Sequence, residues 1–201
     1  MDFDSVDGAE PTLGTFMATA SIVTGTFVSP PKSLFVSLTD QSANGGYSIS
    51  FPVTPTTVRL EFQVRAAVLG QGASLSNVGL SMDSTWRGLT VLMNPRCNFH
   101  VEEYFSLADG GFEQNDHPGA ELAGCDGDAG AWHHVVLTLT VDDSSQQYTS
   151  SLTVDEQVFE DNQPLSLTWI PGEVGLSLGV TYADGNGSRF YFDNIRVDFT
   201  L

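Results

Sequence analysis

The stretch that decides the fold is Val58-Arg59-Leu60-Glu61-Phe62-Gln63-Val64-Arg65, in which every second residue is apolar. Successive side chains of a β-strand point to opposite faces, so this period of two predicts a strand with one apolar and one polar face. We therefore expect its apolar side chains in the core and its polar side chains on the other face of the sheet.

The same alternation recurs along the chain between clusters of Gly, Pro, Asn, Asp and Ser, while helical periodicity is almost absent. A hairpin turn is expected at residues 142–145 and a second tight turn at Asp155-Glu156. The fold class is all-β, a two-sheet antiparallel β-sandwich (jelly roll) that forms one domain over residues 1–201. The clearest strands are expected at 33–38, 47–51, 58–68, 77–82, 88–93, 98–105, 132–141, 148–154, 175–182 and 189–199.

The charge balance excludes several kinds of partner. The chain carries 25 Asp plus Glu against 7 Lys plus Arg, a formal net charge of -18. Nucleic acid and anionic membrane surfaces both require a basic patch, so neither is an expected partner. With 41% hydrophobic and only 16% charged residues, the chain is expected to bury a core.

Neither a membrane anchor nor an export signal is visible in the sequence. No apolar run approaches 18 residues, so no membrane insertion is expected. Residues 1–8, MDFDSVDG, lack the basic and apolar regions of a signal peptide. A secreted or cell-surface location would therefore require an export signal that is absent from this chain.

The segment from Ala108 to Ala131 is rich in Gly and Asp and is expected to be the longest loop. Cys97 precedes this loop and Cys125 lies near its end. A disulfide between them would be worth about 3.6 kcal/mol in the chain-entropy model. Both cysteines sit in polar, turn-rich surroundings, which favours the disulfide over two buried free thiols.

Four short segments resemble a known superfamily. Arg189-Phe-Tyr-Phe-Asp-Asn-Ile-Arg-Val197 resembles the closing strand of extracellular jelly-roll modules, and Asp2-Phe3-Asp4 resembles their opening strand. Pro31-Lys-Ser-Leu-Phe-Val36 is similar to the strand usually written Gly-Lys-Tyr-Ser-Leu. Gly130-Ala-Trp-His-His-Val135 resembles the Gly-x-Trp-His-His-Val run of concanavalin A-like and laminin G-like sandwiches.

This resemblance implies an extracellular carbohydrate-binding module with a structural calcium ion. In such modules calcium joins the first strand to the last, and the matching ligands here are Asp4, the Lys32 carbonyl and Asp193. Calcium takes six to eight oxygen ligands, which these distant segments would supply together. The shorter Asp4 replaces the usual Glu of the first strand. Without calcium, Asp193 would cap a turn and Asp4 would be solvated.

Glycan binding calls for exposed aromatic rings beside polar groups. The rings that we expect in such a site are Trp86, Tyr104, Trp169 and Tyr182, whereas Trp132 is expected in the core. His133 and His134 are adjacent on a strand, so they should point to opposite faces and cannot jointly chelate one metal ion.

Catalytic signatures of the related enzymes are absent. We find no Glu-x-Asp-x-x-Glu arrangement of the kind retaining glycosidases of this fold use, and no Gln-x-His motif of lyases. The expected function is thus a noncatalytic, secreted or cell-surface carbohydrate-binding or adhesion module.

Two alternatives stay open. One is a structural or assembly protein of an envelope or shell. The other is a polysaccharide-degrading enzyme, a glycoside hydrolase or lyase, whose acid, base and charge-neutralising groups would be found among Arg87, His100, Glu102 and Tyr104. The sequence predicts no oligomeric state.

Overall fold

The computed structural model describes an all-β protein. It describes residues 12–16, 18–26, 28, 32–38, 44–51, 55–69, 72–82, 85–94, 96–106, 111–123, 130–142, 144, 147–166, 173–184 and 187–201. Its strands are β1 (Thr12–Phe16), β2 (Ala18–Val23), β3 (Ser33–Leu38), β4 (Asn44–Phe51), β5 (Thr57–Val68), β6 (Gly72–Met82), β7 (Thr85–Asn94), β8 (Asn98–Ser106), β9 (Phe112–Asp116), β10 (Ala120–Glu121), β11 (His133–Asp142), β12 (Gln147–Val154), β13 (Gln157–Pro164), β14 (Glu173–Asp184) and β15 (Arg189–Thr200).

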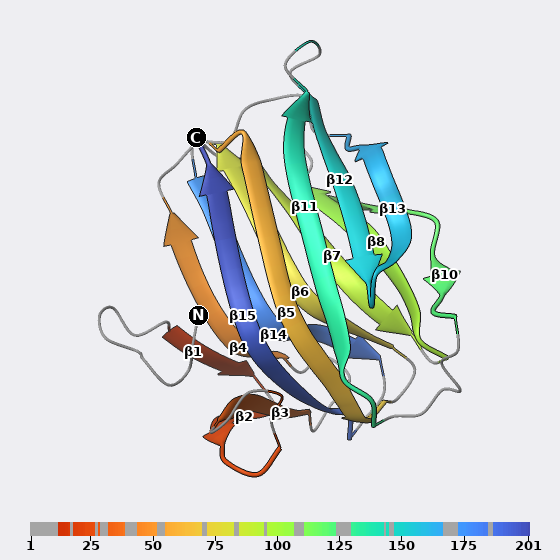
Figure 1. The fold of residues 1–201 in the computed structure, drawn as a ribbon. Coiled ribbons are helices and arrows are strands. Elements are labelled where there is room, and N and C mark those ends of the chain that lie inside the picture. The colour runs from red at the N-terminus through yellow and green to blue at the C-terminus, as the bar shows by residue number, and fades with distance from the viewer. Residues whose placement is uncertain are drawn as a thin grey trace.

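The strands form two antiparallel sheets that pack face to face as a sandwich (Figure 1). Sheet A has the order β1-β4-β14-β6-β7-β8-β10, and β9 also pairs with β8. Sheet B has the order β13-β12-β11-β5-β15-β3-β2 and lies in front in Figure 1. The predicted fold class is therefore confirmed. No helix in the described part of the chain is long and apolar enough to cross a membrane.

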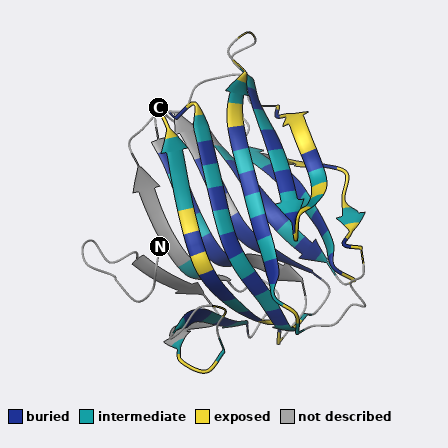
Figure 2. Ribbon diagram, in the orientation of Figure 1, coloured by how far each residue is buried: buried dark blue, intermediate teal, exposed yellow. Residues whose placement is uncertain are grey.

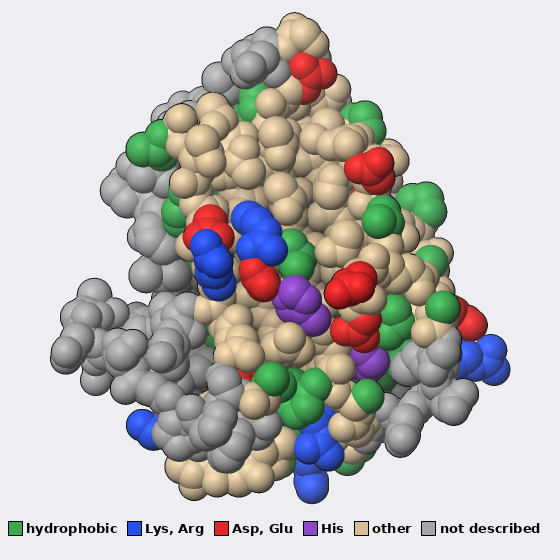
Figure 3. Space-filling view, viewed as in Figure 1, with side chains coloured by type: hydrophobic (Ala, Val, Ile, Leu, Met, Phe, Trp, Pro, Cys, Tyr) green, Lys and Arg blue, Asp and Glu red, His purple; other side chains and the backbone are tan. Residues whose placement is uncertain are grey.

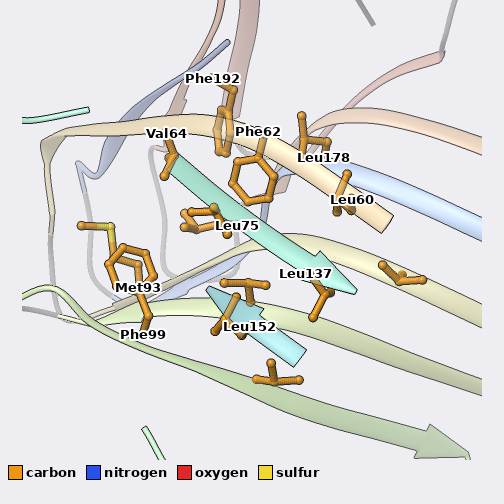
Figure 4. Close-up of a cluster of buried hydrophobic side chains, with 14 of the residues drawn as sticks. Leu60, Phe62, Val64, Leu75, Met93, Phe99, Leu137, Leu152, Leu178 and Phe192 are labelled. Atoms are coloured by element: carbon orange, nitrogen blue, oxygen red, sulfur yellow. The ribbon is translucent and has the colours of Figure 1, made fainter. Parts of the chain in front are cut away.

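The core lies between the sheets and follows the predicted alternation. From Val58 to Ala66 of β5, the alternating apolar side chains are at most 2% exposed, while the polar residues between them are half-buried. Figure 2 shows this alternation as dark and light bands along the strands of sheet B. Side chains from both sheets meet in the core close-up (Figure 4), with Phe62 and Phe192 of sheet B on one side and Leu75, Met93 and Phe99 of sheet A on the other.

All ten of the strands expected from the sequence are present, and the hairpin of β11 with β12 pairs Val135 with Val154 through Asp142 with Gln147. The turn at Asp155-Glu156 is also confirmed, with φ values of 47° and 67°. Such left-handed backbone suits a tight hairpin turn, and it joins β12 to β13.

The alternation of apolar and polar residues did not predict the short or polar strands. The expected loop 108–131 contains β9 and β10, both of which pair with β8. The sequence of β9, Phe-Glu-Gln-Asn-Asp, has no apolar alternation because it is an edge strand whose backbone hydrogen bonds hold it in place. The same holds for β13, whose residues 161–164 are exposed.

The closing strand β15 lies between β5 and β3, and it contains a bulge. Asp193 pairs with Gln63 and Arg196 pairs with Glu61, so two residues of β15 oppose one of β5. Asn194 in the bulge has a φ of 50°. The bulge bends β15 beside Asp193, which is 3% exposed.

Candidate functional site

Strand β8 presents different side chains to the two faces of sheet A. Phe99 and Val101 are fully buried in the core, and Glu103 follows them at the same alternating position with 0% exposure. The intervening residues His100, Glu102 and Tyr104 therefore face away from sheet B, on the outer face of sheet A.

Glu102 is the centre of a polar network on this outer face. Its Oε2 accepts a hydrogen bond from the Tyr104 hydroxyl, and its Oε1 accepts one from Nε2 of Gln114. The same Nε2 donates to Oδ1 of Asp116 at 2.9 Å. Asp116 is the register partner of Glu102 on β9. Because these neighbours surround it, Glu102 is only 3% exposed although it faces outward, whereas Gln114 and Asp116 are exposed.

Glu102 and Asp116 hold different charges near neutral pH. Burial, together with the hydrogen bond and charge of Asp116, raises the pKa of Glu102 to about 7, against the opposing hydrogen bond from Tyr104. Hydrogen bonds from Gln114 and Glu102 lower the pKa of Asp116. Below about pH 7 the pair therefore holds one proton, which resides on Glu102, and Asp116 is the carboxylate. Such a pair can both donate and accept hydrogen bonds.

His100 lies on the same face, and burial lowers its pKa despite the attraction of Asp116. Its Nδ1 is buried without a hydrogen-bond partner among the described residues. The imidazole is therefore neutral near pH 7. The outer-face network, defined as His100, Glu102, Tyr104, Gln114 and Asp116, thus carries one negative charge while Glu102 is protonated, below about pH 7.

A second polar cluster lies inside the sandwich and bridges the two sheets. Nε2 of His117 lies 3.0 Å from Oε1 of Glu103 on β8, and Nδ1 lies 2.7 Å from Oε2 of Glu160 on β13. The backbone N–H of His117 donates to the Val101 carbonyl at 2.9 Å, which holds the ring at this point. The three side chains are 0 to 6% exposed. We call Glu103, His117 and Glu160 the inter-sheet triad.

The charges of the triad are fixed by its hydrogen bonds. Burial disfavours the imidazolium, but the bonds to Glu103 and Glu160 outweigh it and raise the pKa of His117 to about 9. Burial also works against ionised Glu103, yet hydrogen bonds from His117, Ser166 and Asn115 lower its pKa. At neutral pH the result is a charged imidazolium between carboxylates. A buried charge requires partners of opposite charge such as these.

Arg87 belongs to the interior cluster. Its Nη1 lies 3.4 Å from Oε2 of Glu103, and it also hydrogen-bonds Ser166 on the sheet B side. The enzyme hypothesis grouped Arg87 with His100, Glu102 and Tyr104. The structure brings the last three together on the outer face, but it directs Arg87 to the other face of the sheet, because Arg87 and Glu102 stand at opposite alternating positions.

The other predicted ring residues are partly described. Trp86 lies in β7 and Tyr182 in β14, both strands of sheet A, but their side chains are outside the described part. Trp169 lies outside the described residues. Trp132 was expected in the core and is half-buried instead, because it precedes β11 at the alternating position opposite to that of the buried His133.

The predicted calcium ligands are described only in part. Asp193 is buried, and its Oδ2 and Oδ1 accept hydrogen bonds from the backbone N–H groups of Val28 and Asn194, each at 2.7 Å. Lys32 directly precedes β3 and is half-buried, whereas Asp4 lies outside the described residues. Within the described ranges, no group of three or more His, Cys, Asp and Glu residues is arranged to hold a metal ion.

Cys97 is buried and disulfide-bonded. Cys125 lies outside the described residues, so its pairing with Cys97 stays a prediction. The adjacent histidines do point to opposite faces. His133 is buried with Nδ1 2.8 Å from Oδ2 of Asp155, and half-buried His134 has Nε2 2.8 Å from Oε1 of Glu61.

Sequence reasoning missed the inter-sheet triad. A signal was present in β8, where Phe99-x-Val101-x-Glu103 places a carboxylate at a core position of an alternating strand. A buried acid requires a partner. The partners could not be named, because His117 and Glu160 come from segments that the alternation did not assign.

The comparisons with known proteins establish the fold. No family model matches the chain, and no curated protein matches it in sequence. Among solved structures, the cellulose-induced protein Cip1 is similar with a TM-score of 0.56 and 12% identity over 92% of this chain and 90% of that chain.

Two further structures are similar. A Saccharomyces cerevisiae protein of unknown function has a TM-score of 0.50 and 8% identity, over 90% of this chain and 97% of that one. The botulinum neurotoxin type G receptor-binding domain has a TM-score of 0.50 and 5% identity over 94% of this chain. The chain spans 43% of that neurotoxin chain.

Proposed function

We propose that this protein is a noncatalytic carbohydrate-binding β-sandwich of the concanavalin A-like and laminin G-like kind, which binds a glycan on the outer face of sheet A. The observation that carries the proposal is the outer-face network. The half-buried Tyr104 ring stands beside an amide, a protonated acid and a carboxylate. Sugar hydroxyls both donate and accept hydrogen bonds, and this network supplies partners for both.

The charge of the molecule favours a neutral glycan at this face. With a net charge of -18, a polyanionic chain would be repelled at moderate ionic strength. The face also carries the Asp116 carboxylate, and among the described residues no Lys or Arg nitrogen lies within 4.0 Å of the Glu102 or Asp116 carboxylate. Catalysis is not part of the proposal, since Arg87 is held by Glu103 on the other face.

A panel of neutral oligosaccharides tests the binding site. We expect Tyr104→Ala to lower the affinity for the best ligand by roughly tenfold or more, because it removes the aromatic ring and one hydrogen-bond partner of Glu102. The matched control is Gln163→Ala, an exposed position on β13 of sheet B, which should leave the affinity unchanged. An affinity that Tyr104→Ala leaves intact, or no binding to any glycan, would contradict the proposal.

We also propose a structural calcium ion held by Asp4, the Lys32 carbonyl and Asp193, and a secreted or cell-surface location. Supporting calcium, Asp193 is a buried carboxylate whose Oδ2 accepts a hydrogen bond from the backbone N–H of Val28, four residues before Lys32 in the sequence. A disulfide at Cys97 supports an oxidising compartment.

A thermal melt tests the calcium site. The melting temperature of the wild-type protein should rise on addition of calcium and fall with EDTA, whereas that of Asp193→Asn should not respond. Asp198→Asn, at an exposed ion pair of the same strand, is the control. A wild-type protein whose melting temperature ignores calcium rules out the site.

A further inference from the structure

The cationic side chains of this acidic protein gather on one face. Of its 7 Lys and Arg residues, 4 lie on two neighbouring strands of sheet B. They are Arg59 and Arg65 on β5 and Arg189 and Arg196 on β15. Figure 3 views this outer face and shows Lys and Arg side chains beside a group of hydrophobic ones in its lower half.

Arg59 and Arg196 are already paired with carboxylates. Arg59 bonds Glu61, and Arg196 lies 2.9 Å from Asp198. Arg65 differs from both, because no carboxylate of the described residues lies within 4.0 Å of it. Its Nε is buried and has no hydrogen-bond partner in the described part of the chain. In a chain with 25 acidic residues, an arginine without an acidic partner calls for an explanation.

Aromatic rings flank Arg65 on the same face. Its guanidinium carbon lies 6.0 Å from the centre of the Tyr191 ring, a cation–π distance. The Tyr191 ring lies 4.9 Å from that of Phe35 on β3. On the other side, the pairing of His133 with Val64, extended by one residue, brings Trp132 opposite Arg65. All four of these residues are half-buried.

The row Phe35, Tyr191, Arg65 and Trp132 thus crosses four adjacent strand positions. Neighbouring strands lie about 4.8 Å apart, so the row is about 14 Å long. Rings along such a row offer apolar faces to a flat ligand, and a guanidinium binds a carboxylate through parallel N–H donors. The carboxylate of Asp193, on the same strand as Tyr191, accepts hydrogen bonds from the backbone of Val28 and Asn194.

We propose that this row is a second glycan site, which recognises a sugar that bears one carboxylate. The sugar ring lies on Tyr191 and Trp132, and its carboxylate pairs with Arg65. The ligand class rests on the proposed carbohydrate-binding function, but the site lies on the opposite sheet from the outer-face network. A single carboxylate suits the site, because a polyanion would meet the net negative charge of the whole molecule.

The test compares each acidic sugar with its own methyl ester, which keeps the ring and removes the charge. Oligosaccharides that carry one glucuronate, galacturonate or sialate are immobilised beside their methyl esters, and the best pair is titrated by calorimetry near 0.15 M salt. We expect the acid to bind roughly 10- to 100-fold more tightly than the ester, as a charge-assisted hydrogen-bonded pair would give.

Variants assign the difference to Arg65. Arg65→Gln should lower the affinity for the acid to that for the ester, and Tyr191→Ala should lower the affinity for both ligands. Arg196→Gln is the matched control, since that side chain is 67% exposed and paired with Asp198. It should change the affinity by less than about twofold. The comparison of acid with ester uses wild-type protein, so it stands even where a variant fails to fold.

Three results would overturn the inference. The first is equal affinity for acid and ester in every pair. The second is a loss of affinity for the acid that is as large in Arg196→Gln as in Arg65→Gln. The third is a preference for the acid that Tyr104→Ala abolishes. The last would move the ligand to sheet A. Neutral glycan binding that depends on Tyr104, with no acid preference, would leave the proposed function standing and remove only this second site.

Discussion

Replacing His117 with Gln tests the inter-sheet triad through the pH dependence of stability. The pKa of His117 rises from 6.5 to about 9 on folding. A shift of this size is worth roughly 3 kcal/mol, and little of it is lost to solvent screening because the side chain is 3% exposed. Since the folded protein holds the proton more tightly, this stabilisation is complete below pH 6.5 and is lost as the pH rises through about 9.

Urea unfolding at a series of pH values from 6 to 9.5 measures the effect. The wild-type free energy of unfolding should fall by roughly 3 kcal/mol between pH 6.5 and 9. His117→Gln should be less stable by about 3 kcal/mol at pH 6, because it leaves two buried carboxylates without their cation. Above pH 6.5 it should keep only the smaller fall that Glu102 contributes as the pH passes 7. The slope m should be unchanged, since the same surface unfolds.

His134→Gln is the matched control. That imidazole also pairs with a glutamate, Glu61, but its side chain is 37% exposed. A solvent-exposed pair contributes about 0 to 1 kcal/mol, so this variant should keep the wild-type pH dependence above pH 6.5. A wild-type free energy that stays flat from pH 6.5 to 9, or a His117→Gln variant with the same fall, would refute the charged triad.

Two further predictions concern stability. Glu102, with its pKa raised from 4.5 to about 7, contributes stability that is present below pH 4.5 and lost as the pH rises through 7. Glu102→Gln, which mimics the protonated acid, should therefore remove that pH dependence and be more stable than wild type at pH 8 in urea unfolding; equal or lower stability there would count against a protonated Glu102. Glu156 has a φ of 67°, so Glu156→Gly should raise the free energy of unfolding by up to about 1 kcal/mol, and a loss of stability would show that its side chain matters.

Much of the fold was accessible from the sequence, and the candidate sites were accessible only in part. The alternation in β5, β11 and β15 predicted the strands and their buried faces, because a side chain's face depends only on its position along a strand. Tyr104 was named in advance as a ligand-binding residue, and Glu102 and His100 as its neighbours in an alternative role. Their shared face follows from their spacing within one strand, which sequence alone provides.

The sequence by itself determined the properties that depend on local residue spacing and on total charge. These are the all-β class and the opposite faces of His133 and His134, together with the expectation, from a net charge of -18, that nucleic acid is not a partner. Only the tertiary structure decided which distant residues meet, because strand order and register are set by packing across the whole sandwich. In the folded protein Glu160 of β13 pairs with His117, and Arg87 pairs with Glu103. Arg65 lies beside the Tyr191 ring, and no described carboxylate pairs with it.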